Sequence, residues 1–474
     1  MRVIGGSWAV VLMAIAGCED PPDRTTDSGP GPDAGLPGDG GSREDAGPLD
    51  DGGSREDAAQ WNDEDPPPNP SLAASSWPIY HGDSYARHYS DLPAVEGAAE
   101  VSVDLVELDG DAIFVLFDPV DDIFTVARGL TGASLWKIDR ESLAVVGRVD
   151  LSAEGAFAGV YGFVDAAGDP VLGIGKRVVR YEGPGGTLAE EAAAELGDVL
   201  GEEEVLVAAS ALFSGEIAFV GSEGTVGVLG SSLDGGPLAT LQLGGSSVSN
   251  ALSLDEDGGL FIVTSSAIHR VDWTGEDLQE SWSHPVEAPY EEPRPGRLGT
   301  GSGTTPALMG RDRVVLADDA ESVNLLVLRR TAGDGPREVC KLPAFDGEAA
   351  TDNAIVVAGR TMIIEQNLTG LSGVARIDMS PEGRCERVWL ADVLAPTSVP
   401  TLSTASGLVY VYSFDDASGW ALTGLDLDTG QVRLTVPTGD GAAYNNVYSA
   451  VTVGPDRRIY VGVLAGLLVI ADVP

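Results

Sequence analysis

Positively charged residues are scarce in this chain. Lys and Arg together number 28 against 74 Asp and Glu, which gives a formal net charge of −46 at neutral pH. A surface of that sign repels phosphate backbones, so we expect no nucleic-acid partner. The excess of acid predicts a highly soluble surface, and no Asp-x-Asp-x-Asp-Gly loop points to specific cation binding.

Cysteine and histidine are also rare. The chain has three cysteines and four histidines, and no Cys-x-x-Cys pair, His-Glu-x-x-His, Gly-x-Ser-x-Gly or phosphate-binding loop. We therefore assign no catalytic residue and no metal site. His81 and His88, seven residues apart, leave a metal pair open, and His269 lies on a predicted strand in a structural position. A Cys340–Cys385 disulfide stays open, because both cysteines occupy similar positions in successive repeats.

Long hydrophobic runs are absent, apart from one at the N-terminus. Residues 3–16 follow Arg2 and end in small residues before Cys18. A membrane span needs about 20 apolar residues, whereas a short apolar core with a small-residue boundary is typical of a secretory signal. The run resembles the lipobox of bacterial lipoproteins, which implies a signal peptide over 1–18 and a lipid on Cys18. We expect a lipid-anchored protein of the bacterial cell envelope, with the inner or outer membrane left open.

Aliphatic residues almost disappear over residues 19–74. This stretch is rich in Asp, Gly, Pro, Ala and Ser, and the octamer Asp-Gly-Gly-Ser-Arg-Glu-Asp-Ala occurs at both 39–46 and 51–58. Such a chain cannot bury enough apolar surface to offset its conformational entropy. We expect a disordered acidic linker that tethers the folded part to the membrane.

Residues 75–474 are expected to form the folded part, and residues 100–474 carry a repeat of about 48 residues. Short runs rich in Val, Ile and Leu recur at this spacing and are bounded by Gly and Asp turns. Runs of this kind predict strands, and a period of 40–50 residues with several strands is typical of propeller blades. The runs begin at Ile123, Val171, Ile217, Leu260, Val314, Met362, Val409 and Ile459.

The repeat predicts an all-β, eight-bladed β-propeller of four-stranded antiparallel blades. Seven blades stay open if the unit 159–196 is irregular, and two β-sandwiches are the other architecture we considered. The last repeat lacks an outer strand, and residues 101–106 lie before the first repeat. These residues can complete the last blade and close the ring.

Two motifs resemble the quinoprotein (PQQ)-like propellers, including uncharacterised bacterial lipoproteins. One is the Trp-Pro-Ile-Tyr-His-Gly-Asp segment at 77–83 with Arg-His-Tyr-Ser at 87–90, and the other is the repeat at 421–430. The resemblance implies the propeller fold and assigns Trp282 and Trp389 to docking neighbouring blades. The vicinal Cys-Cys often found in the quinone enzymes is missing here, so the cofactor is unassigned. Pyrroloquinoline quinone with calcium belongs only to the enzyme alternative.

Polar residues precede several inner strands, at the predicted mouth of the central channel. Converging amides, hydroxyls and carboxylates there can bind a polar ligand, or can cap strand ends and hold channel water. These candidate ligand-binding residues are Asn250, Thr304, Thr305, Asp352, Asn353, Asn445 and Asn446.

The sequence as a whole favours a membrane-tethered extracytoplasmic propeller that acts as a binding or scaffold module. A protein or glycan partner at one propeller face is expected. Two alternatives remain, a PQQ-type quinoprotein oxidoreductase and a metal-dependent propeller hydrolase or lactonase.

Overall fold

The computed structural model describes residues 61–98, 100–129, 132–151, 161–185, 187–244, 247–331 and 336–473. The chain divides into a unit of residues 1–60 and a unit of residues 61–474, and the second unit carries every described strand. The predicted signal peptide, Cys18 and linker residues 19–60 lie outside the described residues. In the described ranges, no helix is long and apolar enough to cross a membrane.

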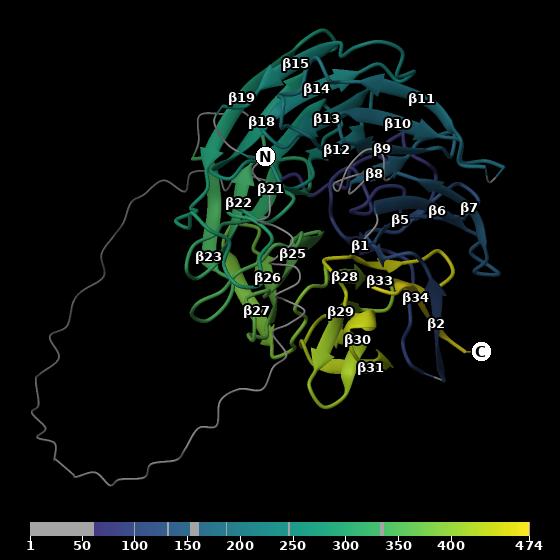
Figure 1. Cartoon of the computed structure of the whole chain (residues 1–474). Coiled ribbons are helices and arrows are strands. Elements are labelled where there is room, and N and C mark those ends of the chain that lie inside the picture. Colours follow the sequence, from purple (N-terminus) through teal and green to yellow (C-terminus); the bar gives the residue numbers. More distant parts are fainter. Residues whose placement is uncertain are drawn as a thin grey trace, which may run out of the picture. The chain divides into compact units, whose positions relative to one another are not determined.

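Eight sheets follow one another around a ring, and their strands are antiparallel except for the short β1 (Tyr89–Ser90), which pairs parallel with β28 near the centre of the ring (Figure 1). Each sheet begins with an inner strand and ends with an outer one. The first four blades are β3–β7 (Asp111–Ala112, Leu116–Phe117, Ile123–Gly129, Gly132–Ile138, Val145–Asp150), β8–β11 (Gly162–Val164, Pro170–Ile174, Arg177–Tyr181, Glu190–Glu195), β12–β15 (Leu206–Ala211, Ile217–Gly221, Thr225–Leu229, Ala239–Gln242) and β16–β19 (Ser253–Leu254, Gly259–Val263, Ala267–Trp273, Leu278–Pro285).

The other four blades repeat this order. They are β20–β23 (Ala307–Met309, Arg313–Ala317, Asn324–Arg329, Glu338–Pro343), β24–β27 (Val356–Ala358, Thr361–Glu365, Val374–Met379, Cys385–Ala391), β28–β31 (Thr401–Ser403, Leu408–Asp415, Gly419–Asp426, Val432–Gly439) and β32–β34 (Val451–Val453, Ile459–Val463, Gly466–Asp472) with β2 (Val101–Glu107). The eight-bladed prediction is confirmed. The seven-bladed alternative is wrong, because the second unit forms a regular four-stranded blade.

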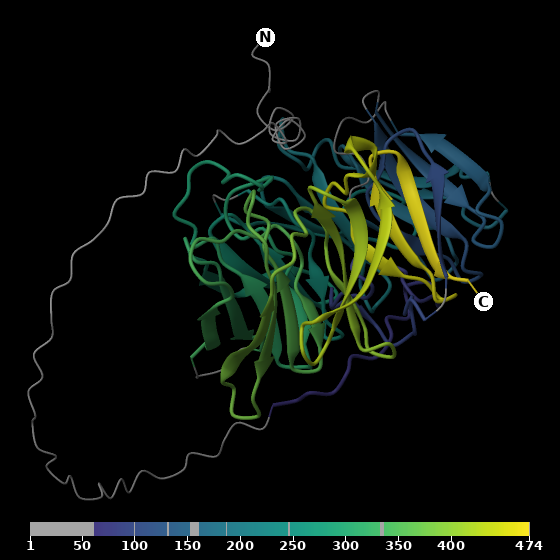
Figure 2. The ribbon, with the colours of Figure 1, turned by 90° about the horizontal axis from the view of Figure 1, so that it is seen from below.

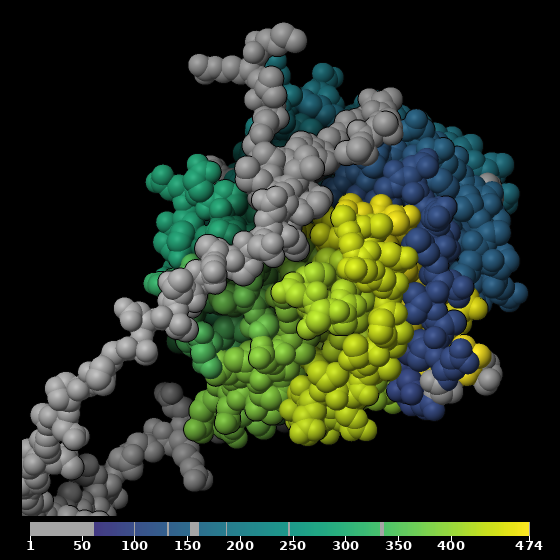
Figure 3. Space-filling model, turned by 60° about the horizontal axis from the view of Figure 1, so that its bottom comes forward, coloured from purple at the N-terminus to yellow at the C-terminus, as the bar shows by residue number. Residues whose placement is uncertain are grey.

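The ring is closed by pairing the two ends of the propeller. Strand β2 pairs antiparallel with β34, from Val101 opposite Asp472 to Glu107 opposite Gly466. In Figure 3 the blue residues of this region lie against the yellow C-terminal blade. The predicted outer strand for the last blade is confirmed, and the pairing leaves β34 with no free edge.

Burial varies systematically across a blade. Every residue of β13, β17 and β21 is buried, whereas the outer strands β7 and β27 alternate exposed and partly buried residues. The second strands are covered on both faces by neighbouring blades, so their sequences are continuous apolar runs. Trp282 Nε1 donates to Arg330 O (2.9 Å) and Trp389 Nε1 to Leu427 O (2.8 Å), and each bond reaches the next blade, as the family resemblance implied.

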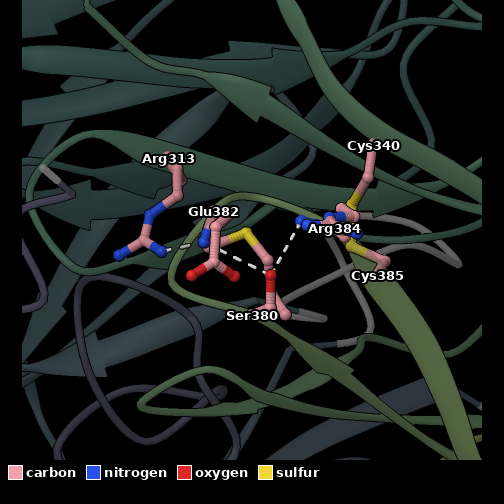
Figure 4. Close-up of a disulfide and its surroundings, with 7 residues drawn as sticks. Arg313, Cys340, Ser380, Glu382, Arg384 and Cys385 are labelled. Atoms are coloured by element: carbon pink, nitrogen blue, oxygen red, sulfur yellow. Dashed lines mark hydrogen bonds between the residues drawn. A yellow bond between two sulfur atoms is a disulfide. The ribbon is translucent and has the colours of Figure 1, made fainter. Parts of the chain in front are cut away.

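A disulfide joins the outer strands of blades 5 and 6. Cys340 on β23 and Cys385 on β27 have Cα atoms 6.0 Å apart (Figure 4). Their similar positions in successive repeats therefore place them side by side on adjacent strands. This distance lies within the range that a disulfide spans without backbone movement.

The folded unit begins earlier than the boundary expected at residue 75. Residues 61–74 were assigned to the linker, yet Trp61 packs beside Val339 and Ala73 N donates to Val164 O (2.9 Å). These residues look like linker in composition, but the propeller supplies contacts that local sequence does not show.

Candidate functional site

Residues 72–90, which we call the plug, run across one face of the ring (Figure 2). We expected this Trp-Pro segment to wrap the ring, but its carbonyl groups accept hydrogen bonds from inner strands of six of the eight blades. The inner strands are sheet edges, and the plug satisfies N–H groups that would otherwise lack partners. The donor and acceptor pairs are Phe117–Trp77, Val164–Pro78, Leu254–Ser84, Leu308–Tyr85, Val357–Arg87 and Leu402–His88.

Aromatic rings of the plug fill the middle of the channel. The ring centroids of Tyr80 and His81 are 4.6 Å apart, those of His81 and His88 4.4 Å, and those of Tyr80 and Tyr161 4.9 Å. His81 Nε2 lies 3.0 Å from Thr305 Oγ1, and the Tyr80 hydroxyl donates to Leu252 O (3.0 Å). The channel floor is therefore a packed cluster of rings tied to blades 4 and 5.

The two plug histidines are neutral. His81 Nδ1 and His88 Nε2 are in direct contact, so one nitrogen donates and the other accepts. Burial lowers the pKa of His88 to about 3, and burial together with the neighbouring His88 holds the pKa of His81 well below its ordinary value. The two histidines for which a metal pair was left open are therefore in direct contact with each other in this structure.

Residues 286–306 form a long connection between blades 4 and 5, which we call the lid. Its Arg297 is buried and contacts two carboxylates, with Nη2 2.8 Å from Asp352 Oδ1 and Nη1 paired with Asp319. Arg294 Nη2 reaches the same Asp319 at 2.5 Å. Two guanidinium groups therefore balance two buried carboxylates, one after β21 and one before β24.

Backbone contacts press the lid against neighbouring blades. The Tyr448 hydroxyl donates to Gly296 O, and Thr369 N donates to Pro295 O (3.3 Å). Gly296 has φ +85°, and a Cβ there would lie 1.9 Å from Asn367 O. Only glycine allows this approach, so the lid is shaped to lie on blades 6 and 8.

Glu365, at the end of β25, is a buried carboxyl that the sequence analysis missed. It accepts hydrogen bonds from Asn353 Nδ2 (2.9 Å), Asn367 Nδ2 (2.9 Å) and Ser398 Oγ (3.3 Å), all uncharged donors. Burial raises the pKa of Glu365 well above its ordinary value, because no cation among its partners offsets the cost of burying the charge. The signal for it was an acidic residue directly closing the apolar run Met-Ile-Ile.

Two of the seven predicted mouth residues, Asn250 and Asn353, tie neighbouring blades together. Asn250 Nδ2 donates to Ser302 O (3.1 Å) and Asn353 Nδ2 to Ser398 O (2.6 Å), and each bond reaches the start of the next blade. Thr304 Oγ1 accepts from Ala317 N (3.1 Å). Contacts of this kind agree with the alternative given in the sequence analysis, in which these polar residues cap strand ends and do not bind a ligand.

The remaining predicted residues lie elsewhere around the channel. Thr305 contacts the floor and Asp352 holds the lid. Asn446 Nδ2 donates to Gly462 O (2.9 Å), and Asn445 O accepts from Leu464 N (3.0 Å). The side-chain oxygens of Asn353, Asn445 and Asn446 are buried and have no hydrogen-bond partner among the described residues.

Comparison with known proteins supports the fold. No protein-family model matches the chain. An uncharacterized protein of Archaeoglobus fulgidus is 27% identical over 458 residues, which cover 85% of this chain and 88% of that protein.

Solved structures with this fold include BamB and several dehydrogenases. BamB from Moraxella catarrhalis matches with TM-score 0.54 and 15% identity, over 78% of this chain and 97% of that one. A quinohemoprotein alcohol dehydrogenase from Pseudomonas putida matches with TM-score 0.60 and 12% identity, over 84% and 80%. A europium-containing methanol dehydrogenase matches with TM-score 0.55 and 10% identity, over 84% and 98%. At these identities the likeness shows the fold alone: the chain is a β-propeller structurally similar to BamB and to quinoprotein dehydrogenases.

Proposed function

We propose that this protein is a membrane-tethered, extracytoplasmic binding or scaffold propeller of the bacterial cell envelope. A lipid on Cys18 is the anchor, and residues 19–60 are the spacer. A protein or glycan partner binds the face that carries the lid. The lipobox resemblance, the acidic linker composition and the fold shared with BamB support this proposal.

The closed channel is the observation that carries the proposal. Plug rings fill its middle, and Arg297 of the lid occupies the mouth between two carboxylates. Binding is therefore expected on the outer side of the lid. Leu298 of the lid is 48% exposed, and Leu371 is 41% exposed on the blade 6 loop that the Thr369–Pro295 hydrogen bond joins to the lid. Exposed apolar side chains grouped on one surface are typical of interaction sites.

A quinone cofactor fits this channel poorly. The contacting rings of Tyr80, His81 and Tyr161 leave no planar slot between them. The disulfide of the described residues lies on outer strands, so it cannot serve as the cysteine pair beside a quinone. We rank the oxidoreductase and the hydrolase below the binding module, and no group of three or more His, Cys, Asp or Glu in the described ranges is placed to hold a metal.

Two measurements in cells test the proposal. Labelled palmitate should appear in the wild-type protein and be lost in Cys18→Ala, which should leave the membrane fraction. A photo-crosslinking residue at Leu298 should give one discrete adduct, whereas the same residue at Val145, similarly exposed on an outer strand, should not.

If Cys18→Ala took up as much labelled palmitate as the wild type, Cys18 would not be the lipid anchor. If the crosslinking residue gave the same adducts at Leu298 and at Val145, the lid face would not be the binding surface. Dye reduction by the purified protein after addition of pyrroloquinoline quinone and calcium would replace the proposal with the oxidoreductase.

A further inference from the structure

Four arginines gather on blades 5 and 6 of this strongly acidic chain. They come from the β20–β21 turn, the start of β21, the end of β22 and the β24–β25 turn. We call Arg311, Arg313, Arg329 and Arg360 the arginine patch. The chain carries only 28 basic residues against 74 acidic ones, so four arginines close together stand out on it. A cluster of positive charge attracts an acidic ligand.

Residues 61–65 of the same chain occupy this patch. The Asp63 carboxylate pairs with both Arg313 and Arg360, which belong to different blades. Glu64 Oε2 lies 3.3 Å from Arg311 Nε. The segment therefore offers carboxylates to three of the four guanidinium groups, through charge-assisted contacts.

An aromatic contact completes the recognition. The guanidinium carbons of Arg329 and Arg313 lie 4.6 and 5.4 Å from the centroid of the Trp61 ring. Cation–π contacts at such distances are favourable, and more so when the groups are shielded from water. A tryptophan two residues before a carboxylate is thus the pattern that the patch reads.

The propeller also provides a seat for the backbone of the segment. Asn62 N donates to Asp312 Oδ2 (2.9 Å), and Asn62 O accepts from Arg311 N (2.9 Å). Gly310 has φ +56°, and a Cβ there would lie 2.2 Å from Asn62 O. A Cβ on Gly383 would lie 3.1 Å from the Trp61 ring. Glycine at both contact points lets the segment approach closely, which indicates a site built for a short peptide.

The arginine patch is part of the propeller blades, whereas residues 61–65 lie on the surface of the propeller. Arg313 is 0% exposed, but the side chains of Glu64 and Asp65 are 67% and 72% exposed. Residues 61–65 are in no strand and are followed by three prolines, which favour an extended chain. The segment can therefore leave its seat without breaking a sheet.

We propose that the arginine patch is a docking site for short acidic segments in which tryptophan precedes a carboxylate by two residues. Residues 61–65 fill it in cis, and a partner protein's segment of the same chemistry exchanges with them. Because residues 61–65 are tethered to the propeller, their effective concentration at the arginine patch is about millimolar. A partner's segment must displace them at that concentration. The site is separate from the lid face and does not depend on the binding function proposed for that face.

Binding of a labelled peptide to the full-length protein tests this directly. The probe is a fluorescein-labelled peptide of residues 58–69, and the receptor is the chain carrying Trp61→Ala with Asp63→Asn. Fluorescence anisotropy should show micromolar binding to this double variant and at least tenfold weaker binding to the wild type. The peptide should also raise the melting temperature of the double variant.

Matched controls define the chemistry. Peptides carrying the same Trp or Asp substitution should bind at least tenfold more weakly. Adding Arg360→Gln to the double variant should weaken binding several-fold, whereas Arg433→Gln on an outer strand should not. If the double variant does not fold, the single variant Asp63→Asn replaces it as the receptor. It should bind the peptide more tightly than the wild type does, by up to tenfold.

Three results would overturn the proposal. One is that the emptied patch does not bind the peptide, another is equal binding by the wild type, and the third is equal binding of the substituted peptides. Concentration-dependent dimers of the wild type that the peptide dissociates would assign the site to a second copy of this chain instead of a separate partner.

Discussion

The plug and the lid close the same channel by different physical means. The plug uses backbone hydrogen bonds to six blades and a cluster of neutral rings, including His81 and His88. The lid uses buried guanidinium and carboxylate groups, with Arg297 between Asp319 and Asp352. The comparison shows that a propeller channel can be filled by apolar packing on one side and by paired charge on the other. The two sides should respond differently to truncation, pH and loss of charge.

The largest effect should come from the plug. Trp77 is fully buried, so Trp77→Ala should lower the free energy of unfolding by about 3–5 kcal/mol through lost burial and a cavity. Urea unfolding followed by circular dichroism measures this loss. The exposed lid variant Leu298→Ala is the control, and a loss for Trp77→Ala no larger than that of the control would show that the plug does not stabilise the ring.

Removing one charge from the lid should cost slightly less. Arg297→Met leaves Asp352 buried without its cation, which should lower the free energy of unfolding by about 3 kcal/mol. The double variant Arg297→Met with Asp352→Leu should recover part of this loss, because no buried charge is then unpaired. A double variant less stable than Arg297→Met would contradict the pairing.

Acid should weaken the plug through its histidines. The pKa of His88 is about 3 in the folded protein and near 6.5 in the unfolded chain, so the unfolded state binds more protons below pH 6.5. This contribution to stability is complete above pH 6.5 and decreases as the pH falls, by about 2 kcal/mol between pH 7 and pH 5. Unfolding midpoints at the two pH values should differ more for the wild type than for His88→Gln, and equal differences would refute the assignment.

The lid side should show the opposite pH trend at Glu365. Burial raises the pKa of Glu365 above its unfolded value, so this group favours folding at low pH and opposes it once the unfolded carboxyl ionises above about pH 4.5. Glu365→Gln keeps an uncharged hydrogen-bonding side chain and should stabilise the protein at pH 7. The gain over wild type should vanish near pH 4, and a gain independent of pH would exclude protonation as its cause.

The smallest effects belong to the outer side of the lid. Leu298→Ala and Leu371→Ala should change the free energy of unfolding by no more than about 0.5 kcal/mol, because both side chains are exposed. The same variants should nonetheless reduce formation of the crosslinked adduct expected at the lid face. A large loss of stability would show that these leucines serve packing and not binding.

Much of the fold was predictable because it depends on a repeated local pattern. The apolar runs at Ile123, Leu260 and Val314 are second strands in the structure, and residues 101–106, expected to close the ring, lie in the closing strand β2. In the candidate site, Thr305 contacts His81 and Asp352 contacts Arg297, and the sequence did not show either pairing. Those partners lie more than fifty residues away in sequence, in segments without strand periodicity.

The sequence by itself determined the blade repeat, because each blade must alternate turns with apolar runs to bury both faces of its sheet. It also marked the acidic, aliphatic-poor stretch that follows Cys18. Only the tertiary structure decided that the plug crosses the channel, that Cys340 meets Cys385, and that residues 61–65 sit on the arginine patch. These contacts join residues far apart in the chain, and their energy depends on neighbours that only the closed ring brings together.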